Sequence, residues 1–185
     1  MKNVSSLYSF SSAKQLAFTA LFSAFCLLGT LVIVIPLPSA GYFNTGDVFV
    51  LLSGWCLGPL YGSLAAAIGS SLADIVSGFA FYAPATFIIK GFDAFIAYMV
   101  WAFCKKAIKK ESLDFLCRAF STIFAELFMV LGYLLFESVF YGFGVAVASV
   151  LGNVLQAICC AVLAVALVAS VGAIKKIKQY FPHLG

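Results

Sequence analysis

The sequence predicts an all-α integral membrane protein, and three observations lead to this fold class. Hydrophobic residues make up 64% of the 185 residues and charged residues only 10%, which is too little polar surface for a water-soluble globule. The mean hydropathy of +1.11 likewise makes lipid the solvent for most of the chain. Cationic residues cluster at Lys2 and Lys14, at 105–118 and at 175–178, and apolar runs of bilayer length separate these clusters.

The length and the charge pattern together predict the topology. A spanning helix takes about 20 residues, so residues 1–185 suit a single domain of about six transmembrane helices, without a separate soluble module. Because cationic residues collect at cytoplasmic helix ends, the three clusters place both termini in the cytoplasm. The net charge of +4 follows from this topology, and we expect no nucleic-acid partner.

The first half of the chain predicts three of these helices. The first is expected over residues 16–35, because Pro36 and Pro38 prevent its continuation. A polar loop follows, and then an apolar run over 47–57. This run is only about 16 Å long as a helix, so it must lie obliquely or stop short of crossing the hydrocarbon core. The glycines and proline of 58–62 predict a turn into the third helix.

The second half of the chain predicts three more helices. The fourth runs over 85–104 and ends at the charged stretch 105–111, which the membrane cannot accommodate. The fifth covers 116–136, and a turn at 137–144 leads to the sixth, which extends to about residue 173. The charged stretch is therefore expected to be a cytoplasmic loop.

Few polar residues interrupt the apolar runs, and these are the candidate ligand-binding residues. Lys90 and Asp93 are three positions apart on the fourth helix, so they could neutralise each other or anchor a ligand. Glu126, Tyr133 and Glu137 are spaced by seven and four residues, which puts them within about 20° of one direction. A polar stripe on an apolar helix must face the bundle interior or a cavity.

Amides and outer-loop residues complete the candidate set. Asn153 and Gln156 on the sixth helix can turn toward the same space, where they would bind a polar ligand or form an interhelical hydrogen bond. Six residues of the outer connections either outline a binding mouth or, for the tyrosines, anchor the membrane interface. They are Tyr42, Asn44, Asp47, Asp74, Tyr82 and Thr86. The predicted substrate-binding set includes all of these except Asp74.

Catalysis finds little support in the sequence. The one histidine, His183, lies near the C-terminus, so neither a Ser-His pair nor a histidine metal site can be assembled. No G-x-x-x-x-G-K phosphate loop is present, and the cysteines form no C-x-x-C pair. We therefore expect no enzyme, metal or cofactor, and uphill transport would need energy from a partner. A small intramembrane enzyme that uses Lys90, Asp93 and Glu126 is the weaker alternative.

Four segments follow one another along the chain: Gly46-Asp47-Val48, Gly58-Pro59-Leu60-Tyr61-Gly62, Ala73-Asp74, and the stretch from Tyr82 to Gly91. This series resembles the S components of energy-coupling factor (ECF) transporters, in the subgroup with the riboflavin, hydroxymethylpyrimidine and pyridoxine proteins. The resemblance implies a vitamin-binding subunit in a bacterial cell membrane, which docks on an EcfT-type coupling subunit driven by two cytoplasmic ATPases. It also implies that Ala13, Ala17, Ala20 and Ala24 face the coupling subunit.

The expected ligand is pyridoxine or hydroxymethylpyrimidine. A compact ring with hydroxymethyl groups suits scattered amide and carboxylate partners, because each buried hydroxyl needs a counterpart. An aromatic cage for a flavin is not evident, so riboflavin or another vitamin is the alternative ligand. The alternative function is a self-sufficient secondary transporter or channel, which would carry inverted repeats that the two halves of this sequence lack.

Overall fold

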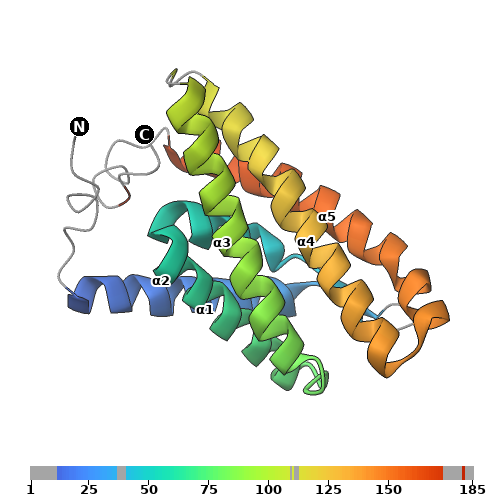
Figure 1. Cartoon of the computed structure of the whole chain (residues 1–185). Helices are drawn as coiled ribbons and strands as arrows, with labels where there is room; N and C mark the ends of the chain where they lie inside the picture. The colour runs from blue at the N-terminus through green and yellow to red at the C-terminus, as the bar shows by residue number, and fades with distance from the viewer. Residues whose placement is uncertain (1–11, 37–40, 109, 111–112, 173–180, 182–185) are drawn as a thin grey trace.

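The computed structural model describes residues 12–36, 41–108, 110, 113–172 and 181 (Figure 1). Its elements in chain order are α1 (Ser12–Val32), β1 (Val34–Pro36), β2 (Tyr42–Asn44), α2 (Asp47–Val76), α3 (Ala83–Ile108), α4 (Asp114–Phe140) and α5 (Phe143–Gly172). The five helices in this part of the chain are long and apolar enough to cross a membrane, which confirms an all-α membrane protein. Lys2, Pro38, His183 and the lysines of 175–178 lie outside the described residues.

α2 is not one straight helix, because its backbone is broken at Gly58. This residue has φ 83° and ψ −177°, a conformation that favours glycine, and Pro59 follows it. The Ser53 hydroxyl donates a 3.0 Å hydrogen bond to the carbonyl of Gly62, nine positions along the chain. Nine residues of straight helix would span about 13 Å, so the chain doubles back at the break.

The prediction of six transmembrane helices is confirmed in part, because the described residues contain five helices of membrane length and the break at Gly58 divides the second of them. The expected second and third helices are the two arms of α2. The first arm, 47–57, is too short to cross the membrane, and nearly all of its residues are buried. A helix that is surrounded by protein needs no polar face, which explains the uniformly apolar sequence of this arm.

Three other boundaries differ from the sequence-based expectation. α1 ends at Val32, and β1 pairs antiparallel with β2 where only a polar loop was expected. α4 continues through Glu137 to Phe140, so the expected turn over 137–144 shrinks to the two residues before α5. α3 continues through Lys105 and Lys106 to Ile108, so the first part of the expected loop over 105–111 is helical. Arg118 lies in α4, within the range of the expected fifth helix, and it is buried.

α2 occupies the centre of the bundle. It contacts α1, α3 and α5, while α4 packs between α3 and α5 (Figure 1). Small residues permit these close approaches, since a Cβ on Gly69 would collide with the backbone of α1 at Ser23. The outward faces carry exposed large apolar side chains, such as Leu16, Phe103 and Val139, which suit contact with lipid.

One end of the bundle, next to the α3–α4 connection, is held by a tryptophan–arginine cluster of Trp55, Trp101, Asp114 and Arg118. The Arg118 guanidinium lies 4.4 Å from the ring centroid of Trp101 and 5.4 Å from that of Trp55. Asp114 accepts hydrogen bonds from Arg118 Nε at 2.7 Å and from Trp101 Nε1 at 2.9 Å. The cluster ties the first arm of α2 to α3 and α4.

Candidate substrate-binding site

A narrow cavity of about 30 Å³ lies at the opposite end of the bundle from the tryptophan–arginine cluster, near the α2–α3 and α4–α5 connections. Its wall comes from β2, the end of α2, the start of α3, the second half of α4 and the first half of α5. It contains eight of the predicted substrate-binding residues, together with Gly41 and Asp74. The eight are Tyr42, Asn44, Tyr82, Thr86, Tyr133, Glu137, Asn153 and Gln156.

Two tyrosine–carboxylate hydrogen bonds lie in the wall of this cavity. The Tyr42 hydroxyl donates to Asp74 Oδ1 at 2.5 Å, and the Tyr82 hydroxyl donates to Glu137 Oε1 at 3.2 Å. Burial, reinforced by the neighbouring carboxylate, raises the pKa of Tyr42 and likewise that of Tyr82. Both tyrosines are therefore neutral hydrogen-bond donors at physiological pH.

Each carboxylate in the wall has a second oxygen with its own role. Glu137 Oε2 accepts a hydrogen bond from the Ser149 hydroxyl, so α5 holds this side chain in place. Asp74 Oδ2, in contrast, has no hydrogen-bond partner among the described residues, although Asp74 is only 4% exposed. A buried acceptor of this kind calls for a donor, and a ligand in the cavity could supply it.

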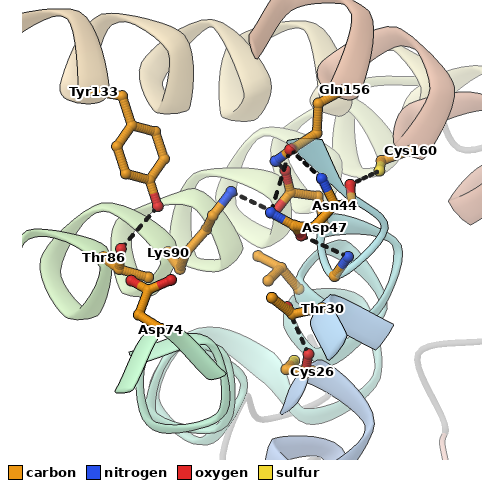
Figure 2. Close-up of polar contacts among 12 residues, drawn as sticks. Cys26, Thr30, Asn44, Asp47, Asp74, Thr86, Lys90, Tyr133, Gln156 and Cys160 are labelled. Atoms are coloured by element: carbon orange, nitrogen blue, oxygen red, sulfur yellow. Dashed lines mark hydrogen bonds and ion pairs between the residues drawn. The ribbon is translucent and has the colours of Figure 1, made fainter. Parts of the chain in front are cut away.

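A chain of polar contacts joins the cavity wall to the bundle interior (Figure 2). Gln156 Oε1 accepts from the backbone N–H of Asn44 at 2.8 Å and from its Nδ2 at 3.3 Å. Gln156 Nε2 donates to Asp47 Oδ2 at 2.6 Å, and the Lys90 ammonium forms an ion pair with Asp47 Oδ1. On the opposite side of the site, the hydroxyls of Thr86 and Tyr133 are 3.0 Å apart.

The structure corrects the predicted pairing of Lys90 with Asp93. Lys90 is 3% exposed, and its ammonium contacts Asp47 from α2, which is 43 positions away in the chain. Asp93 and Glu126 are buried, and their carboxylate oxygens make no hydrogen bond within the described part of the chain. These four members of the predicted set lie outside the cavity wall, and only Asp47 is hydrogen-bonded to a residue of that wall.

Asp74 and Gly41 are the wall residues that the predicted set omits. Asp74 was expected, with the other residues of the outer connections, to outline a binding mouth, although the predicted substrate-binding set left it out. Its place in the wall agrees with that expectation. Gly41 contributes no side chain, and its place in the wall follows from the β1–β2 hairpin.

The predicted partner-facing alanines lie on α1, away from the cavity. Ala13, Ala17, Ala20 and Ala24 are all exposed. Their spacing of four, three and four residues places them on one face of the helix. The exposure leaves this face open to another membrane helix, and its role as an interface stays a prediction.

Comparisons with known proteins identify the family. The model of the family described as "ECF-type riboflavin transporter, S component" matches residues 10–173. A protein of Pyrococcus woesei, described as "Uncharacterized protein in gap 3'region", is 35% identical over 130 residues. The matched region covers 70% of this chain and 82% of that protein.

Proposed function

Because this chain belongs to the family of S components of ECF-type transporters, we propose that its cavity binds a vitamin or vitamin precursor for uptake. The observation that carries this proposal is the convergence of eight separately predicted polar residues on one cavity. They come from regions of the chain that are more than a hundred positions apart, such as Asn44 and Gln156. Polar groups inside a membrane bundle are energetically costly, so a cluster of them indicates a function.

The chemistry of the wall favours a ligand that donates hydrogen bonds. Asp74 Oδ2 lacks a donor among the described residues. Hydroxyl or N–H groups of a ligand could also donate to Asp74 and Glu137 in place of the tyrosine hydroxyls that now do so. The amides of Asn153 and Gln156 can serve either as donors or as acceptors. A ring with hydroxymethyl or amino substituents satisfies these groups.

Pyridoxine and hydroxymethylpyrimidine fit this description, and riboflavin is the competing ligand. The wall consists of polar and tyrosine side chains with a glycine, so it offers no broad aliphatic slot for a tricyclic ring. The family description favours riboflavin. A cavity of about 30 Å³ holds about one water molecule, so any of these vitamins must displace the wall as it enters.

The proposed topology places the cavity toward the outside of the cell. The lysines at the end of α3 then face the cytoplasm, in accord with positive-inside orientation, and both chain termini lie on the cytoplasmic side. The exposed alanine face of α1 would meet an EcfT-type coupling subunit in the cell membrane, and two cytoplasmic ATPases would supply the energy. The protein itself acts as a binding subunit and not as an enzyme.

The ligand is tested by native mass spectrometry of the purified protein, followed by titration with pyridoxine, hydroxymethylpyrimidine and riboflavin. We expect one of these to bind with saturation and to raise the thermal transition temperature. Ser170→Ala, an exposed position on α5 far from the cavity, should bind like the parent protein. Uptake by the isolated protein in sealed vesicles without ATP would instead support a secondary transporter.

The partner surface is tested separately with Ala20→Trp and Ala24→Trp. A bulky side chain on this face should prevent assembly with the coupling subunit while vitamin binding by the isolated S component is retained. Intact assembly of both variants would contradict the proposed interface. Val32→Trp, also exposed on α1 but about 90° around the helix from the alanine face, is the matched control.

A further inference from the structure

Two carboxyl groups lie buried between the cavity and the tryptophan–arginine cluster. Asp93 on α3 is 0% exposed and Glu126 on α4 is 4% exposed. None of their four oxygens has a hydrogen-bond partner in the part of the chain that the structure describes. Buried polar atoms are almost always satisfied, so this pair requires an explanation.

The nearby ammonium group is already committed elsewhere. Lys90 forms its ion pair with one oxygen of Asp47, and Gln156 donates to the other oxygen. The charges of Lys90, Asp47 and Asp93 all act on Glu126, and those of Lys90 and Asp47 act on Asp93. One cation therefore faces three carboxyl groups in this cluster.

Among the described residues, Lys90 is the cation that acts on Asp93 and Glu126, and the surrounding helices add no second one to these interactions. From α1 the Cys26 thiol faces Asp47, Lys90 and Asp93, and from α5 the Cys160 thiol faces Asp47, Glu126 and Lys90. Tyr133 of α4 faces Lys90 with its ring, 5.4 Å from the ammonium. If all three carboxyl groups were ionised, the cluster would carry a net charge of −2 inside a membrane.

An ionised carboxylate without a partner is far less stable in a membrane interior than the neutral acid. A like charge nearby disfavours ionisation further, because two carboxylates in one low-dielectric site repel each other. We propose that Asp93 and Glu126 form a proton-binding site, in which both carboxyl groups are protonated in the folded, ligand-free protein at neutral pH. Asp47 is the ionised partner of Lys90 in this cluster.

The site predicts a definite dependence of stability on pH. An acid that is protonated in the folded state and ionised in the unfolded chain makes the folded state bind more protons. Stability is then complete at acidic pH and falls as the pH rises above the ordinary range of exposed carboxyl groups, about 4. Each such acid makes the folded protein bind up to about one proton more than the unfolded chain, and this difference sets the slope of stability against pH.

Infrared spectroscopy of the ligand-free protein tests the proposal directly. We expect a carbonyl stretch of protonated carboxylic acid at neutral pH, and Asp93→Asn and Glu126→Gln should each remove a component of it. Asp114→Asn changes a partly exposed carboxylate that is paired with Arg118, so it should leave this band unchanged. The measurement needs no vitamin, so it tests the proton-binding site even if none of the proposed vitamins binds.

Thermal unfolding across a pH series is the second measurement. Because an amide has the shape of a neutral acid, Asp93→Asn and Glu126→Gln should fold, and each should flatten the fall of the transition temperature with rising pH. Loss of folding in both variants, an unchanged pH slope, or a wild-type spectrum without the protonated band would overturn the proposal. A transition temperature that rises with sodium concentration in the parent protein, but not in either variant, would also overturn the proposal, in favour of a bound metal cation.

Discussion

The two ends of the bundle hold their polar side chains in different ways. At the cavity, carboxylates accept hydrogen bonds from tyrosines, and Asn44 of β2 donates to the side-chain amide of Gln156 on α5. In the tryptophan–arginine cluster, one guanidinium lies against two indole rings and is paired with Asp114. Under the proposed function, the comparison separates a region that rearranges when a ligand binds from a region that keeps its contacts.

The largest expected effect comes from breaking the tryptophan–arginine cluster with Arg118→Ala. The change removes a buried cation and opens space between Trp55 and Trp101, while Asp114 loses one partner and keeps Lys105 and Trp101. We expect a loss of about 3 kcal/mol in stability. This value is at the low end for a buried pair because Asp114 is partly exposed. Thermal unfolding measures it, and ligand affinity per folded molecule should be preserved.

The exposed Lys110 supplies the control for that experiment. Lys110→Ala should change stability by no more than about 0.5 kcal/mol, since it removes a solvated side chain. If Arg118→Ala instead weakened ligand binding and left stability unchanged, the division of roles between the two ends would be wrong.

Asp74→Asn should produce the next largest effect, at the cavity. The substitution replaces an acceptor with a donor at the oxygen that has no hydrogen-bond partner in the described residues. We expect ligand affinity to fall by about 10-fold or more, which corresponds to about 1.4 kcal/mol. Isothermal titration measures the affinity, and a variant that binds as tightly as the parent protein would remove Asp74 from the proposed site.

Tyr42→Phe should have the smallest effect of the three. It removes the hydrogen bond between β2 and Asp74, at a cost of about 1 kcal/mol in stability, and it should speed ligand dissociation. Because the pKa of Tyr42 is raised on folding, this contribution should be complete below about pH 10 and decline only above it. Unfolding midpoints of both proteins between neutral and strongly alkaline pH test this, and a difference already lost at pH 8 would contradict it.

The sequence was a good guide wherever a polar residue interrupts an apolar run. Lipid excludes such residues, so Tyr133, Glu137, Asn153 and Gln156 were expected to face inward, and they line one cavity. Local spacing was a poor guide to their partners. Lys90 has Asp93 three positions away on its own helix, yet it pairs with Asp47, because helix packing decides which side chains meet.

The sequence was also a good guide to the break in α2. The residues of 58–62 indicated a turn, and the apolar run over 47–57 was expected to be too short to cross the membrane, which agrees with its burial as the first arm of α2. Arg118 was expected near the start of the fifth helix, but the sequence did not indicate that it would be buried. Its burial depends on Trp55 and Trp101, which come from distant parts of the chain and surround its guanidinium.

The reversal at Gly58 gives the first arm of α2 a mechanical role. This arm begins at Asp47, which is bonded to Lys90 and Gln156, and it carries Trp55 about 12 Å further along. The arm has no break between these two residues, and protein encloses it on nearly every side. It is therefore a rigid strut that holds Asp47 and Trp55 at a fixed separation, so the tryptophan–arginine cluster keeps its place whatever rearranges at the cavity.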